Sequence, residues 1–122
     1  MTNFLLLASI SGAIGVALGA FGAHALKSRL TPERLQTFET GVRYQMYHVA
    51  GLLGASFALS QWPGSMFAVW AGWCFVLGTI LFSGSLYLLV GTNKRWFGVI
   101  TPLGGVAFIL GWILLGMTGL GG

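Results

Sequence analysis

The residues of this chain that could do chemistry are concentrated in one stretch, TPERLQTFETGVRYQMYH at residues 31–48. Within it, Glu39 and Arg43 lie four residues apart with the acid first, which is the favourable order for an ion pair on a helix. Tyr44 and His48 repeat this spacing. Such residues could bind a lipid headgroup or a small polar ligand. Glu39 and His48 could also act as an acid and a base, although nothing more specific points to catalysis.

The composition places these residues in a membrane protein. The chain has 122 residues, is 56% hydrophobic and 7% charged, and has a mean hydropathy of +0.85, so it cannot cover a core with a polar surface. Its six basic and two acidic side chains all lie within residues 27–43 or at residues 94–95. The uncharged remainder predicts an all-α, integral membrane four-helix bundle in a single domain, residues 1–122. The expected spans are about 4–23, 44–60, 65–92 and 96–120.

The first apolar stretch has a competing interpretation as a signal peptide, because Ala23-His24-Ala25 resembles a cleavage site. We expect a span instead, since no Lys or Arg precedes Phe4 and the apolar run is longer than the usual hydrophobic region of a signal peptide.

The basic residues predict the orientation of the chain. All of them lie in the links between spans one and two and between spans three and four, so both links share one side of the membrane. The positive-inside rule makes that side cytoplasmic and both termini periplasmic.

The stretch before span two begins like a helix, with Thr31 as N-cap, Pro32 at the first helical position and Glu33 in the first turn. A helix over 32–60 would measure roughly 44 Å, well beyond a hydrocarbon core of about 30 Å. Its first turns could extend into the cytoplasm or lie along the interface. We favour a bend near Gly41 and an amphipathic interfacial helix over about 32–42, because Leu35 and Phe38 would otherwise face water.

Small residues recur at helical spacing in three of the spans and predict close helix packing. The seams are Ser11, Gly15, Gly19 and Ala23 in the first span, Tyr47, Gly51, Gly54 and Ala58 in the second, and Gly104, Ala107 and Gly111 in the fourth. They could serve the bundle itself or a homo-oligomer.

Four motifs carry a resemblance to a known family: GAFGAHAL at 19–26, TGVRYQMYH at 40–48, LFSGSLY at 81–87 and TPLGGVAF at 101–108. On these motifs the chain resembles the domain of unknown function 423 family, the UPF0382-type small bacterial inner-membrane proteins, which are similar to a eukaryotic transmembrane group. The resemblance covers nearly the whole chain. It implies a bacterial inner-membrane location and a four-helix fold, and it implies no activity.

The predicted topology brings all four motifs to one end of the helices, which predicts a single polar pocket there. Ionisable groups that begin a membrane span normally face the protein interior. The candidate ligand-binding residues are His24, Glu39, Arg43, Tyr44, Tyr47, His48, Ser83, Ser85 and Tyr87, and the residues expected to contact lipid headgroups are Lys27, Arg29, Lys94 and Arg95.

These features favour a binding or accessory membrane protein with a polar site at the cytoplasmic end. A purely structural role of the cluster, a small transporter or channel, and a membrane enzyme acting on a lipid-soluble substrate stay open as alternatives. We predict membrane lipid as a partner and no catalytic residues, cofactor, metal or nucleic acid, because two histidines alone make a weak metal site.

Overall fold

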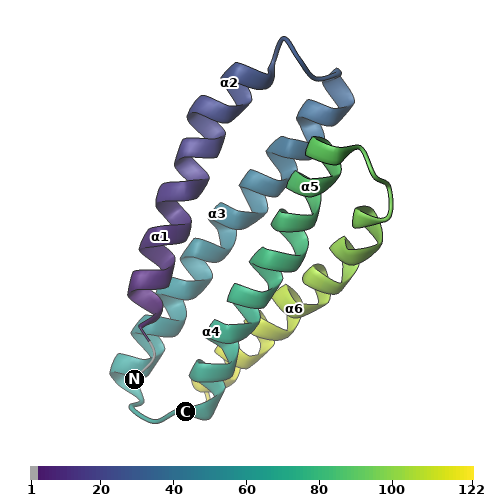
Figure 1. Ribbon diagram of the computed structural model, residues 1–122. Helices are drawn as coiled ribbons and strands as arrows, with labels where there is room; N and C mark the ends of the chain where they lie inside the picture. The colour runs from purple at the N-terminus through teal and green to yellow at the C-terminus, as the bar shows by residue number, and fades with distance from the viewer. Residues whose placement is uncertain (1–2) are drawn as a thin grey trace.

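A computed structural model describes residues 3–122 of the chain, and these residues form four helices and no strand (Figure 1). The first helix comprises α1 (Phe4–Ala17), a π-helical stretch η1 (Leu18–Gly22) and α2 (Ala23–Leu26). The second is α3 (Pro32–Gln61). The third comprises α4 (Met66–Gly78), a second π-helical stretch η2 (Thr79–Ser83) and α5 (Gly84–Thr92), and the fourth is α6 (Phe97–Thr118). The all-α prediction is confirmed.

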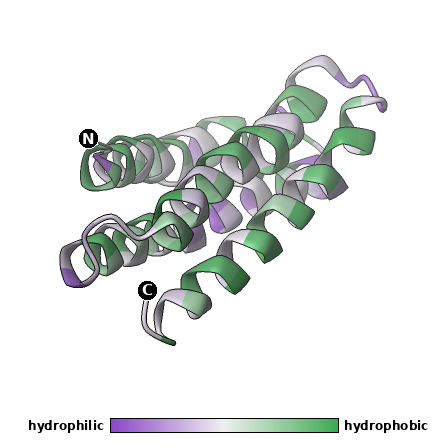
Figure 2. Ribbon diagram, turned by 90° about the horizontal axis from the view of Figure 1, so that it is seen from below, coloured by the Kyte–Doolittle hydropathy of each residue, from purple (hydrophilic) through white to green (hydrophobic). Residues whose placement is uncertain are grey.

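Three of the four helices are long and apolar enough to cross a membrane: Phe4–Leu26, Met66–Thr92 and Phe97–Thr118. α3 is not among them: it carries charged side chains at positions 33, 34, 39 and 43, and its uncharged remainder, 44–61, contains polar residues such as Gln45 and His48. In Figure 2 the ribbons of α1, beside the N label, and of α6, which leads to the C label, are coloured mostly as hydrophobic. The chain therefore has the features of a membrane protein.

The helix ends follow local sequence signals. The Thr31 hydroxyl accepts a hydrogen bond from the Arg34 backbone N–H at 3.2 Å, as the predicted N-cap of α3 should. Ser65 caps α4 in the same way, accepting from the Ala68 N–H at 3.3 Å. Asn93 ends α5 in the left-handed conformation, with φ of 56°.

α3 is one continuous helix of 30 residues and shows no division near residue 42 into an interfacial segment and a span. Gly41, where we expected the bend, instead allows the Tyr87 ring to approach α3 closely, since a Cβ added at Gly41 would lie 2.8 Å from Cε1 of Tyr87. Phe38, expected at the interface, is only 5% exposed and packs against the Tyr87 ring, with centroids 5.5 Å apart. We expected a bend because Leu35 and Phe38 would otherwise face water. The protein itself covers Phe38, so this side chain does not require one.

The helices pack around α3. α1 lies along one side of α3, while α4, η2, α5 and α6 pack on the other and against one another (Figure 1). The apolar core lies toward the end that holds the termini and is made by Phe4, Ala8, Leu52, Ala55, Ala71, Phe75 and Phe108. Beyond its first turns α1 packs mainly on α3, so part of the outer surface of α3 stays uncovered.

The small-residue seams are packing surfaces within the chain, as predicted. A Cβ added at Gly19 would lie 3.1 Å from Val42 of α3, and one at Gly51 would lie 3.0 Å from the Phe75 ring. At Gly104 an added Cβ would lie 2.3 Å from the backbone nitrogen of Phe82. Tyr47 is the exception, because it is 52% exposed and lies outside the packed seam of α3.

The two basic links, residues 27–31 and 93–96, lie at one end of the structure, and the turn at residues 62–65 lies with both termini at the other (Figure 1). The clustering of the basic residues at one end is therefore as predicted.

Candidate functional site

The nine predicted ligand-binding side chains do not form one pocket. His48, Ser83 and Ser85 are buried and Tyr87 is partly buried, whereas the other five are exposed: His24, Glu39, Arg43, Tyr44 and Tyr47. Arg43 and His48 are five residues apart on a regular helix, which separates them by roughly 140° around its axis. One side of α3 therefore carries the charges and another carries the histidine.

The centre of the buried polar network is Gln45, which the sequence interpretation missed. Gln45 is 4% exposed, and its Nε2 donates to the Ser11 carbonyl at 2.9 Å and contacts the Ser11 hydroxyl at 3.3 Å. The Tyr87 hydroxyl donates to its Oε1 at 2.7 Å. One amide thus connects α1, α3 and α5. Its spacing from Gly41 and His48 on the inner face of α3 was the available signal.

Ser83 and Ser85 connect helices rather than facing a ligand. The Ser83 hydroxyl, at the end of η2, donates to the carbonyl of Gly41 at 2.6 Å. Ser85 lies with its hydroxyl 2.8 Å from the Phe82 carbonyl and 2.5 Å from the Thr101 hydroxyl of α6. These contacts occupy both hydroxyl groups that we had predicted to bind a ligand.

Both ring nitrogens of His48 are also in use. Nε2 accepts a hydrogen bond from Nε1 of Trp112 at 2.9 Å, so Nδ1 carries the proton and donates to the Tyr44 carbonyl at 2.7 Å. The imidazole stacks on Phe108 with ring centroids 3.5 Å apart. A neutral, fully bonded ring in this position is a structural group. Within residues 3–122 no group of three or more His, Cys, Asp or Glu side chains could hold a metal ion.

A groove of about 500 Å³ lies between α3 and α6 beside His48, and we call it the aromatic groove. Tyr44 packs on Phe82 within it, with ring centroids 4.6 Å apart, and on Tyr47 at 5.4 Å. The hydroxyl groups of Tyr44 and Tyr47 make no hydrogen bond to any residue that the structure describes. The lining residues are Tyr44, Tyr47, His48, Phe82, Gly105, Phe108, Ile109 and Trp112.

A second groove of about 440 Å³ lies on the other side of Tyr47, between α3 and the first helix, and we call it the charged groove. Glu39 and Arg43 line it together with Gly19, Ala23, Val42, Met46 and Tyr47. Both charged side chains are exposed, and within the described part of the chain they form no ion pair. The expected Glu39–Arg43 pair is therefore absent, although both side chains line one groove.

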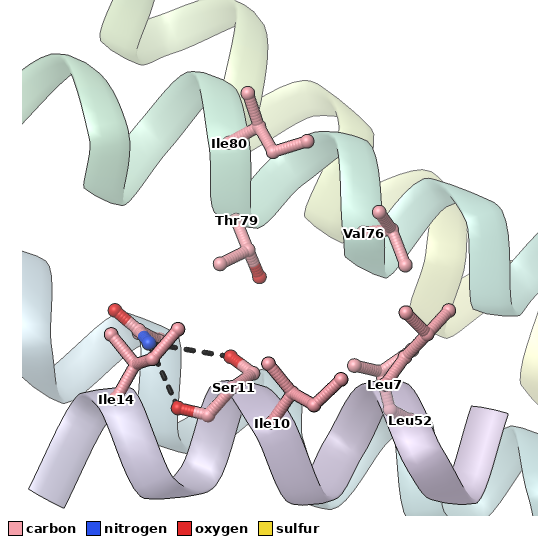
Figure 3. A pocket seen from close by; sticks show the side chains of 9 residues that line it. Leu7, Ile10, Ser11, Ile14, Leu52, Val76, Thr79 and Ile80 are labelled. Atoms are coloured by element: carbon pink, nitrogen blue, oxygen red, sulfur yellow. Dashed lines mark hydrogen bonds between the residues drawn. The ribbon is translucent and has the colours of Figure 1, made fainter.

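A third pocket, of about 210 Å³, lies between α1 and the α4–η2 segment (Figure 3). Its walls are almost wholly aliphatic. The polar groups that line it are already bonded: on one side Gln45 donates to Ser11, and across the pocket the Thr79 hydroxyl donates to the Phe75 carbonyl at 2.9 Å (Figure 3). This pocket offers apolar surface only.

The predicted headgroup residues Lys27, Arg29, Lys94 and Arg95 are all exposed in the two links at one end. His24 is exposed one turn before the first link and makes no hydrogen bond through its side chain to residues 3–122.

Together these features define an all-helical membrane protein with a bonded polar interior and open grooves around Tyr47. The family model for the protein of unknown function DUF423 matches residues 18–105, and the chain belongs to this family. It is 45% identical to the UPF0382 membrane protein YwdK of Bacillus subtilis over 94% of both chains. It is 43% identical to the UPF0382 inner membrane protein YgdD of Escherichia coli, over 91% of this chain and 84% of that protein. No solved structure matches it.

Proposed function

We propose that this protein is a binding protein of the inner membrane that holds a ring-bearing, membrane-soluble molecule in the aromatic groove. The observation that carries the proposal is the groove itself, about 500 Å³ with a mostly aromatic lining that includes two tyrosines whose hydroxyls bond to no residue described by the structure. Ligand pockets are typically about 300–1,000 Å³, apolar, and supplied with a few polar groups.

The chemistry of the groove favours a flat ring as the ligand. The exposed rings of Tyr44 and Trp112 offer stacking surfaces, which add roughly 0.5–1.5 kcal/mol per aromatic pair beyond area burial. The tyrosine hydroxyls can donate to a carbonyl or hydroxyl oxygen on the ring. Because His48 is bonded at both nitrogens, it shapes the groove rather than reacting with a ligand. Binding therefore explains the geometry better than catalysis.

The proposed setting is a four-span bundle in which α3 also crosses the membrane, with the basic links in the cytoplasm and both termini in the periplasm. All six Lys and Arg residues lie in the links or the first part of α3, which is the support for this orientation. The first turns of α3 then reach the cytoplasmic interface, since a 30-residue helix of about 45 Å exceeds the hydrocarbon thickness.

Two glycines of α6 supply a matched test. A Cβ at Gly105, which lines the groove, or at Gly116, which does not, would meet nothing within 4 Å. We expect Gly105→Leu to fill the groove and Gly116→Leu to leave it open. Each variant is extracted with its surrounding lipid in native nanodiscs, and the small molecules that co-purify are compared by mass spectrometry with those of the bulk membrane.

The proposal predicts a ring-bearing molecule enriched with the wild-type chain and with Gly116→Leu, and lost with Gly105→Leu. Enrichment of no molecule over the bulk membrane, or equal retention by both variants, would refute it.

A further inference from the structure

A fourth cavity lies apart from the grooves around Tyr47, at the end of the structure that holds the basic links. It measures about 230 Å³ and is bounded by the first turns of α3, the last turns of α5 and the link that follows. We call it the α3–α5 cleft. Its lining residues are Glu33, Arg34, Thr37, Leu89, Val90, Asn93 and Arg95.

Arg34 connects the two helices that bound the cleft, α3 and α5. Its Nη2 donates to the backbone carbonyl of Val90, which is one of the last carbonyls of α5 and has no partner within a helix that ends at Thr92. The contact fastens the first turn of α3 to the end of α5. It uses one donor of a guanidinium that has five, and the Nε–H of Arg34 is buried with no acceptor among the described residues.

The cleft carries more positive charge than its own residues neutralise. Arg34 and Arg95 both line it, Glu33 is the one acidic residue in its lining, and neither arginine forms an ion pair within residues 3–122. An unpaired buried N–H of a charged group is costly, and a nearby anion would offset that cost. The side-chain amide of Asn93 adds a neutral donor, whereas the Thr37 hydroxyl already donates to the Glu33 carbonyl at 3.1 Å.

The position of the cleft indicates which anion fits. Leu89 and Val90 form an apolar wall on an apolar helix, so the cleft has a basic side and a lipid-like side. The planar guanidinium group can donate two parallel N–H bonds to two oxygens of one phosphate. We infer that the α3–α5 cleft binds the phosphate of an anionic phospholipid, with Arg34 and Arg95 on the phosphate and the start of an acyl chain along Leu89 and Val90.

The test compares two arginines of the same membrane end. Arg95→Gln removes a charge from the cleft, and Arg29→Gln removes the same charge from the other link, outside it. The full chain is exchanged into nanodiscs of phosphatidylcholine with or without phosphatidylglycerol, and lipid retained through detergent release is counted by native mass spectrometry. Loss of one charge-assisted contact predicts about tenfold weaker phosphatidylglycerol binding for Arg95→Gln. For Arg29→Gln we expect less than about twofold, as for an exposed charge.

Two further arms complete the experiment. Arg34→Lys keeps the charge but replaces the planar fork of five donors by a single nitrogen, which cannot offer a phosphate two parallel N–H bonds, so we expect weaker retention with the far-ultraviolet circular dichroism of the wild type. Inorganic phosphate should compete poorly with the phospholipid. Equal losses in Arg95→Gln and Arg29→Gln would mean general attraction of basic links to anionic lipid and would overturn the inference, as would full displacement of the lipid by free phosphate. Gly105→Leu should leave phosphatidylglycerol retention unchanged, because the cleft is independent of the aromatic groove.

Discussion

The contact between Gln45 and Tyr87 gives the sharpest test of the buried polar network. Gln45→Leu removes the amide that joins α1, α3 and α5, and Tyr87→Phe removes only the hydroxyl that donates to it. Hydrogen bonds between helices in membrane proteins average about 0.6 kcal/mol and reach about 1.7 kcal/mol. At 2.7 Å the Tyr87–Gln45 bond is short and lies in a part of the chain covered by three helices, so we place it above the average, at about 1 kcal/mol.

The two single variants differ in what they leave behind. Tyr87→Phe should lower the free energy of unfolding by about 1 kcal/mol, for one bond lost. Gln45→Leu should lower it by about 1–3 kcal/mol, because it also leaves the Tyr87 hydroxyl without its acceptor. Once Gln45 is gone, removing that hydroxyl should cost almost nothing. The double variant should therefore match Gln45→Leu, which gives a coupling energy of about 1 kcal/mol.

The assay is unfolding in detergent micelles by titration with sodium dodecyl sulfate, followed by circular dichroism. Gln36→Leu is the matched control, since Gln36 is exposed on the same helix, and it should change the free energy of unfolding by no more than about 0.5 kcal/mol. If the two single effects add within about 0.5 kcal/mol, the side chains do not interact. The assignment of Gln45 as the centre of the network would then be wrong.

Two other properties of the chain can be tested by substitution. Gly104→Ala should destabilise the fold by about 1–3 kcal/mol, since its Cβ would lie 2.3 Å from the Phe82 backbone nitrogen. Gly84→Ala, where an added Cβ meets nothing within 4 Å, should be neutral or stabilise by about 0.4–1 kcal/mol in the same titration, and a reversed order would contradict the packing. For topology, single cysteines at Lys27 and Lys94 in a cysteine-free chain should react only from the cytoplasm, and one at Gln61 only from the periplasm. Labelling of all three positions from one side would refute the orientation.

Local sequence was sufficient to predict most of the helical elements. Thr31-Pro32 begins α3 as expected because the cap hydroxyl and the proline act within one turn. The helices Phe4–Leu26, Met66–Thr92 and Phe97–Thr118 begin and end within three residues of the apolar runs in which we expected spans, whereas α3 begins at Pro32, well before the run at 44–60. The same patterns placed both basic links at one end and identified Gly19, Gly51 and Gly104 as packing positions.

The tertiary structure alone decided which partner each side chain meets. Periodicity places Phe38 and Gln45 on one face of α3, but it does not say that Tyr87 of a helix some forty residues further along will cover the first and bond the second. It also does not say that α1 will pack mainly on α3 and leave Glu39 and Arg43 beside an open groove. A helical repeat fixes directions around one axis, whereas contact depends on how several axes pack, and that depends on every side chain between them.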